Sequence, residues 1–100
     1  MVIVIARITC QPGKRAALLD AARAAIVETR KEPGCISYSA YADSMDENLA
    51  IFYEEYASEA ACMEHMGRPY TQALIAAAPQ FVAAAPSIIM HGVSGSRTLA

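Results

Sequence analysis

Apolar and polar residues recur along this chain with two different periods, and the changes of period divide it into strands and helices. Residues 2–11 are rich in β-branched side chains, which predicts a strand that ends at Pro12. Residues 14–31 repeat apolar side chains at helical spacing between charged ones and therefore predict an amphipathic helix. Pro33 and Gly34 end this helix, because the residue before a proline avoids helical geometry and glycine permits a reversal.

The rest of the chain predicts two more strands, two short helices and a last strand. Residues 35–43 and 49–56 alternate as two strands joined by a polar hairpin loop. Ser58 is expected to cap a short helix, and a second short helix is expected to open at Pro69. An alanine- and proline-rich connector then leads to the last predicted strand, residues 87–93.

The order β-α-β-β-α-β predicts an α+β fold of the ferredoxin-like, split β-α-β type, with one antiparallel sheet and its helices on a single face. The 100 residues suit a single domain, expected over residues 1–94, with 95–100 as a flexible tail. The first strand is apolar at Ile3 and Ile5 as well as at its even positions, so both faces of the sheet should be covered. An apolar face without helices favours association. We therefore expect a homodimer in which two sheets pack face to face as a barrel.

Composition and charge narrow the range of partners and compartments. The net charge is −2 and no basic stripe is present, which argues against nucleic acid. Only six apolar residues open the chain and no run reaches the roughly 20 of a membrane span, so neither a signal peptide nor a membrane protein is expected. Three cysteines without a Cys-x-x-Cys motif predict buried thiols in a reducing, cytoplasmic compartment. No phosphate-binding loop or metal-ligand cluster appears, so no cofactor or metal is predicted.

Four short motifs follow one another along the predicted elements. They are Pro12-Gly13-Lys14, Glu32-Pro33-Gly34-Cys35 with Tyr38 after it, Tyr53-Glu54-Glu55-Tyr56, and Ala60-Ala61 with His65 after it. In order and spacing, the chain from about Val2 to about His91 resembles the antibiotic biosynthesis monooxygenase (ABM) domain family. The resemblance implies a dimeric α+β barrel, the same assembly that the two-sided apolar strands predict.

The resemblance implies several activities rather than one. The family includes cofactor-independent monooxygenases of phenols and quinols, haem-degrading enzymes, isomerases of small sugar-like signals, and members without a known reaction. The haem-degrading branch carries Asn, Trp and His where this chain has Ala6, Tyr56 and Leu74, so haem degradation is not expected. The favoured function is a cofactor-independent monooxygenase that oxidises a hydroxylated aromatic, such as a quinol, in an apolar pocket. The alternatives are an isomerase of a small carbonyl compound and a small-molecule-binding dimer without turnover.

His65 is the first candidate for chemistry, because it shares a helix face with Ala61 and Cys62 and should point inward. Imidazole changes charge near neutral pH and can act as a general base. The alternative is a histidine at the edge of the core, bonded to a backbone carbonyl.

The third predicted strand supplies the next candidates. By alignment with the family, Phe52, Glu54 and Tyr56 face the helices and the pocket. A buried carboxylate needs a partner, here Arg7, Arg68, a tyrosine hydroxyl or His65, and Glu54 could equally serve to tie the sheet to a helix. The predicted catalytic residues are His65, Tyr56 and Glu54, and the predicted substrate-binding residues are Tyr38, Phe52, Tyr70 and Leu74. For each tyrosine the alternative is packing with one satisfied hydroxyl group.

Overall fold

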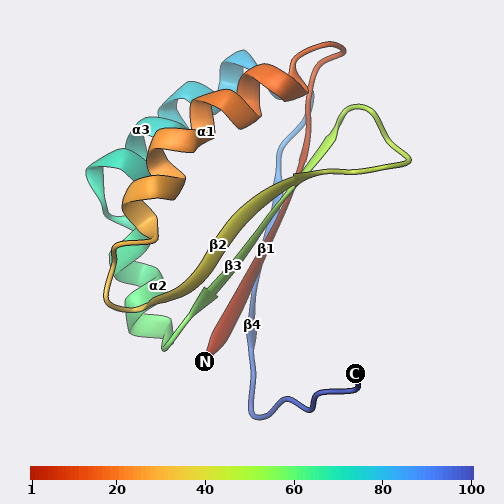
Figure 1. Ribbon diagram of the computed structural model, residues 1–100. Helices are drawn as coiled ribbons and strands as arrows, with labels where there is room; N and C mark the ends of the chain where they lie inside the picture. The colour runs from red at the N-terminus through yellow and green to blue at the C-terminus, as the bar shows by residue number, and fades with distance from the viewer.

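Three α-helices cover one face of a four-stranded antiparallel sheet in the computed structural model, which describes residues 1–100 (Figure 1). The elements are, in chain order, β1 (Val2–Thr9), α1 (Arg15–Thr29), β2 (Cys35–Ala42), β3 (Leu49–Tyr56), α2 (Glu59–Met66), α3 (Pro69–Ala77), the 3-10 helix η1 (Ala78–Gln80) and β4 (Ser87–Gly92). The strands lie in the order β2-β3-β1-β4 and every neighbouring pair is antiparallel. The predicted ferredoxin-like α+β class is confirmed.

The pairing register decides which strand residues face the helices together. Ala6 of β1 lies opposite Phe52 on β3 and Ile88 on β4, and Val4 lies opposite Glu54 and Met90. Directly opposed residues of antiparallel strands point to the same face of the sheet. Glu54 therefore stands beside Val4 on the inner, helix-covered face, as the family resemblance implies.

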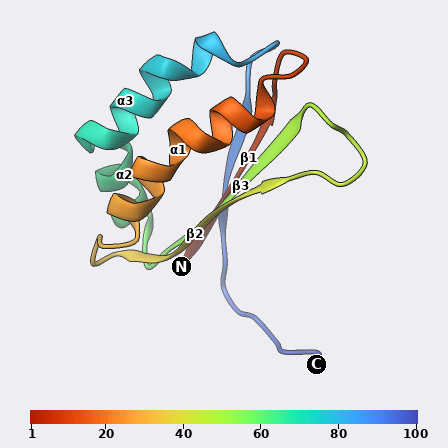
Figure 2. The same ribbon diagram turned by 45° about the horizontal axis from the view of Figure 1, so that its top comes forward.

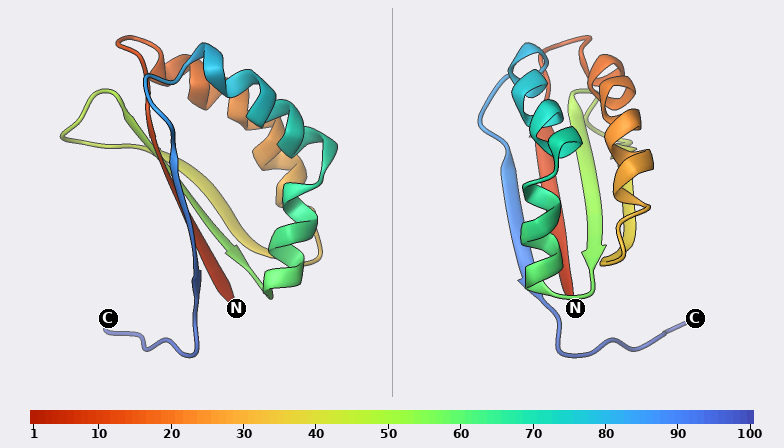
Figure 3. Two further views of the ribbon diagram at one scale, coloured as in Figure 1. Left: turned by 180° about the vertical axis from the view of Figure 1, so that it is seen from behind. Right: turned by 90° about the vertical axis from the view of Figure 1, so that its left-hand side faces the viewer.

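The helices divide the inner face of the sheet between them. Figure 3 shows α1 over the side of the sheet formed by β2 and β3, and α2 and α3 over the side formed by β1 and β4. On α1 the fully buried positions are Leu18, Ala22, Ala25 and Thr29, at the helical spacing that the sequence predicts. None of the helices is both long and apolar enough to cross a membrane.

The start of α2 and the turn before β2 pack against each other. The Ser58 side chain accepts a hydrogen bond from the Ala61 backbone N–H at 3.1 Å, which confirms the predicted cap. A Cβ atom placed on Gly34 would overlap the Cβ atom of Ala61, so the turn can approach α2 this closely only because residue 34 is glycine. This contact brings the turn that contains Glu32 beside the helix that contains His65.

The connector between α3 and β4 is tied to the end of β1. Val82 bridges Cys10, and the Ala83 N–H donates to the Thr9 carbonyl at 2.9 Å. This segment closes one end of the space between α3 and the sheet. After β4 the last residues carry no helix or strand and lead away from the sheet (Figure 2).

The outer face of the sheet has no helix over it. Ile5 lies there opposite Tyr53 and Ile89, and Ile51 lies opposite Tyr41. Tyr41 and Ile89 are 55% and 47% exposed, so large apolar side chains meet solvent on this face.

Candidate functional site

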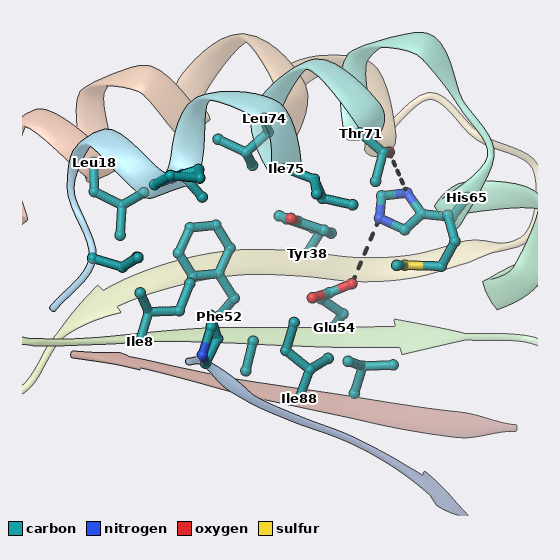
Figure 4. Close-up of a pocket in the computed structure, with 17 residues that line it drawn as sticks. Ile8, Leu18, Tyr38, Phe52, Glu54, His65, Thr71, Leu74, Ile75 and Ile88 are labelled. Carbon is teal, nitrogen blue, oxygen red and sulfur yellow. Dashed lines mark hydrogen bonds and ion pairs between the residues drawn. The ribbon is translucent and has the colours of Figure 1, made fainter. Parts of the chain in front are cut away.

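A cavity of about 360 Å³ lies between the inner face of the sheet and α3 (Figure 4). Its walls are apolar along most of their length and include Ala6, Ile8, Phe52, Leu74, Ile75, Val82, Pro86 and Ile88. The polar lining side chains Glu54, His65 and Thr71 gather at one end, whereas Ile8 and Leu18 lie toward the other. The cavity therefore suits a ligand with an apolar body and one polar group.

His65 lies in the last turn of α2 and is 3% exposed. Its Nδ1 atom lies 3.0 Å from Glu32 Oε2 and 3.5 Å from Thr71 Oγ1, and its Nε2 atom lies 3.7 Å from Glu54 Oε1. One buried imidazole thus stands between two carboxyl groups, one on each ring nitrogen. An imidazole held this way can take up a proton on one side while a carboxylate supports it from the other.

Glu54 is 6% exposed, and its carboxyl group contacts the Tyr56 hydroxyl and the His65 imidazole. The Tyr56 hydroxyl donates a 2.6 Å hydrogen bond to Glu54 Oε1, and His65 lies beside the same oxygen. Of the partners considered from the sequence, the fold therefore selects the tyrosine and the histidine. Burial raises the pKa of Glu54, and the Tyr56 hydrogen bond and His65 only partly oppose that rise.

Glu32 is the buried acidic residue that the sequence reasoning missed. It is 9% exposed, and its Oε2 atom accepts a hydrogen bond from the Tyr70 hydroxyl and lies 3.0 Å from His65 Nδ1. In the sequence it precedes Pro33-Gly34 and marks the end of the first helix, which hides any further role. The sequence signal that could have marked it is its place in Glu32-Pro33-Gly34-Cys35, one of the four motifs that carry the family resemblance.

The predicted substrate-binding residues divide into two groups. Tyr38, Phe52 and Leu74 line the cavity, with the Tyr38 ring centroid 5.5 Å from that of His65. Tyr70 is not among the lining residues and turns its hydroxyl to Glu32; desolvation and that hydrogen bond raise its pKa to about 12. Burial raises the pKa of Tyr38 far above its usual range, so this hydroxyl stays protonated and can donate to a ligand.

The predicted catalytic residues divide in the same way. His65 and Glu54 line the cavity, whereas Tyr56 is fully buried behind Glu54 with its ring centroid 5.2 Å from that of His65. Burial and the neighbouring Glu54 also raise the pKa of Tyr56 strongly, so its hydroxyl acts as a donor to the carboxyl group. Thr71 and Ile75, which the sequence analysis did not select, belong to the lining.

The side chains that commonly bind metal ions are His, Cys, Asp and Glu. No three His, Cys, Asp or Glu side chains come together as a ligand set. Cys10, Cys35 and Cys62 are unbridged, and burial raises the pKa of each thiol. They behave as small, protonated side chains of the core and its margin.

Comparison with known proteins identifies the family. The sequence model of the family described as antibiotic biosynthesis monooxygenase matches residues 1–77. The chain belongs to this family. A relative, the uncharacterised protein sll1783 of Synechocystis sp. (strain ATCC 27184 / PCC 6803 / Kazusa), is 30% identical over 98 residues, which cover 98% of this chain and 67% of the relative.

Solved structures share the ABM fold over nearly the whole chain. Rv0793 from Mycobacterium tuberculosis superposes with a TM-score of 0.87 at 31% identity, covering 97% of this chain and 98% of that one. A Caulobacter crescentus CB15 protein that carries the same family name gives a TM-score of 0.87 at 28% identity, covering 94% and 90% of the two chains. A Deinococcus radiodurans structure reaches a TM-score of 0.90 at 19% identity, which shows the fold alone.

Proposed function

We propose that this ABM-family protein is a cofactor-independent monooxygenase that oxidises a hydroxylated aromatic, such as a quinol, in the cavity above the sheet. The observation that carries the proposal is the buried imidazole of His65, placed at the polar end of an otherwise apolar cavity. A phenol or quinol has the matching shape, since it joins an apolar ring to a hydroxyl group that a base can deprotonate. Membership of the family supports the same class of reaction.

The chemistry needs few protein groups, because the substrate itself supplies the electrons. His65 removes the phenolic proton, and the resulting anion lies between the imidazolium and the protonated Tyr38 hydroxyl. The anion gives two electrons to dioxygen as one oxygen atom bonds to a ring carbon, and the peroxide takes the proton back from His65 to become a hydroperoxide. Its O–O bond then breaks as water leaves together with the hydrogen of that ring carbon. A phenol or naphthol thereby becomes a quinone and a quinol becomes a hydroxyquinone, so one oxygen atom enters the product and the other leaves as water. The apolar walls exclude bulk water while the reactive anion exists.

The working unit that we propose is a homodimer joined through the outer faces of the two sheets. Ile5, Tyr53 and Ile89 lie side by side there, and no helix of the chain covers them. Packing this face against a second copy would remove its apolar area from water, the main driving force of association.

The test is dioxygen consumption by the purified protein with a panel of hydroquinones and naphthols, for the natural protein and His65→Gln. Loss of the base should lower turnover per folded protein roughly 10²–10⁴-fold, the usual share of general-base catalysis. Glu64→Gln is the matched control, since Glu64 precedes His65 on α2 but is exposed and lies away from the proposed dimer interface.

Two results would contradict the proposal. Undiminished turnover in His65→Gln would mean that this residue is not the base. Tight binding of naphthols without dioxygen consumption by the natural protein would favour the non-catalytic alternative, and rearrangement of a small carbonyl compound would favour the isomerase.

A further inference from the structure

The imidazole of His65 meets a different carboxyl group on each nitrogen, and the two contacts are unequal. Nδ1 is within hydrogen-bond distance of Glu32 at 3.0 Å, whereas Nε2 is 3.7 Å from Glu54. A neutral imidazole carries one proton, and the nitrogen without it is the base. The side on which the proton rests therefore decides whether the ring can act on a molecule in the cavity.

Glu32 lies where it can accept a hydrogen bond from the imidazole Nδ1–H. It is buried, and the Tyr70 hydroxyl donates to the same oxygen that lies beside His65 Nδ1. A carboxylate can only accept hydrogen bonds, so an imidazole nitrogen beside it is favoured as the protonated one, and hydrogen bonds to a charged acceptor are the stronger ones. Thr71 Oγ1, at 3.5 Å from Nδ1, is too distant to compete with the carboxylate.

Glu54 is a poorer acceptor for the imidazole. The Tyr56 hydroxyl already donates to its Oε1 atom at 2.6 Å, and the distance to Nε2 exceeds that of a hydrogen bond. Nε2 is therefore the nitrogen left for a ligand at the polar end of the cavity, where Figure 4 shows His65 and Glu54 together.

We propose that Glu32 is the positioning residue of the site: it holds the proton of neutral His65 on Nδ1, so that the unprotonated Nε2 faces the cavity as the base. When Nε2 takes a proton from the substrate, the Glu32 carboxylate faces the positive charge that the ring acquires. The catalytic part rests on the proposed function, whereas the tautomer itself does not.

The fold secures this pair although 33 residues separate its members along the chain. The glycine at position 34 lets the turn after α1 touch Ala61 of α2, two residues after Glu32 and four before His65. Tyr70, in the first turn of α3, completes the arrangement from a third element.

The test is ¹⁵N NMR of the imidazole nitrogens in protein without substrate, recorded over a series of pH values, because a neutral ring is recognised by one protonated and one unprotonated nitrogen. The chain has only two histidines, so His91→Gln assigns the remaining signals to His65. In the natural protein we expect a protonated Nδ1 and an unprotonated Nε2. The reverse tautomer in the natural protein would overturn the proposal, whether or not any variant folds.

Glu32→Gln then tests the carboxylate at nearly constant shape. We expect the His65 signals to move toward the other tautomer and turnover with the quinol panel to fall at least about tenfold, as for other groups that orient a catalytic histidine. Glu28→Gln, an exposed change of the same kind one turn earlier, should alter neither signals nor turnover. A Glu32→Gln protein that keeps the natural tautomer and the natural turnover would overturn the proposal. A shifted tautomer with full turnover would also overturn it, provided that His65→Gln has lost turnover in the same assay.

The failure of the proposed function would look different. If His65→Gln retains turnover while Glu32→Gln still shifts the tautomer, His65 is not the base although Glu32 does position it. His65→Gln therefore distinguishes a failure of His65 as the base from a failure of Glu32 as the positioning residue.

Discussion

At the scale of single residues, Glu54 keeps a carboxyl group on the inner face of the sheet at a cost in stability. Burial raises its pKa above the ordinary value of 4.5, so the folded protein binds this proton more tightly than the unfolded chain does. The stability associated with the protonated group is fully present below the unfolded pKa and is lost as the pH rises through the folded one. As the pH rises, ionisation of this buried carboxyl group therefore destabilises the fold.

Glu54→Gln should raise the free energy of unfolding at neutral pH by about 1 kcal/mol, because the amide removes the buried charge and still accepts from the Tyr56 hydroxyl. Denaturant unfolding over a series of pH values measures the effect, and the gain should shrink toward acidic pH. Glu64→Gln is the control, because Glu64 is exposed on α2, on the helical side of the molecule. A Glu54→Gln protein less stable than the natural one at neutral pH would show that the pairing outweighs the burial.

At the scale of elements, the contact between the turn after α1 and the helix α2 determines the geometry of the site. The Ala57 N–H donates to the Gly34 carbonyl at 2.9 Å, and the Ala61 side chain occupies the space where a side chain at position 34 would lie. The turn and the helix are therefore in direct contact, without a side chain of residue 34 between them. Glu32 and His65 are neighbours as a result.

Gly34→Ala should force α2 away from the turn, since the added methyl group overlaps the Cβ atom of Ala61. We expect a loss of about 1–3 kcal/mol in the free energy of unfolding, the usual cost of overpacking, together with displaced His65 NMR signals. Gly92→Ala is the control, because a Cβ atom there would meet no other atom within 4 Å.

The double variant Gly34→Ala/Ala61→Gly removes the overlap from the other side. It should restore the His65 signals, although glycine within the helix itself costs about 1 kcal/mol. Unchanged stability and unchanged signals in Gly34→Ala alone would show that this close approach does not hold the pair together.

At the scale of the whole molecule, one layer of helices on one sheet leaves the second face of that sheet without cover (Figure 3). Ile5 and Tyr53 on the central strands and Ile89 on the edge strand form a row across this face. A stable interface of this kind buries more than about 1,000 Å² in total. The expected particle in solution is a dimer.

Light scattering at micromolar concentration should give twice the mass of the chain. Ile5→Lys should reduce it to the monomer mass and lower stability, because it places an unpaired charge within an apolar interface. Val27→Lys is the matched control, since Val27 is an apolar residue of α1 that is 54% exposed on the helical side. A monomeric mass for the natural protein would overturn the assembly that we propose.

The order of elements, the fold class and the inward-facing positions of α2 and β3 follow from the sequence by itself. Periodicity and capping are local properties: the helical repeat of α1, the Ser58 cap and the proline at the start of α3 act within a few residues of one another. For the same reason the inward orientation of His65 could be predicted from its helix face. Spacing also groups Glu54 with Phe52 and Tyr56 on one face of the strand, whereas the family resemblance indicated that this face is the inner one.

Only the tertiary structure decided which of these side chains meet. Glu32 and His65 belong to different elements, and their contact depends on how closely a turn approaches a helix, which local spacing does not encode. The sequence likewise could not show which tyrosines line the cavity and which bond to the protein. Tyr38 lines the cavity, whereas the hydroxyl groups of Tyr56 and Tyr70 donate to buried carboxyl groups. A buried carboxylate takes whichever donor the packing brings within reach, so the polar network of this site is a property of the packed elements together.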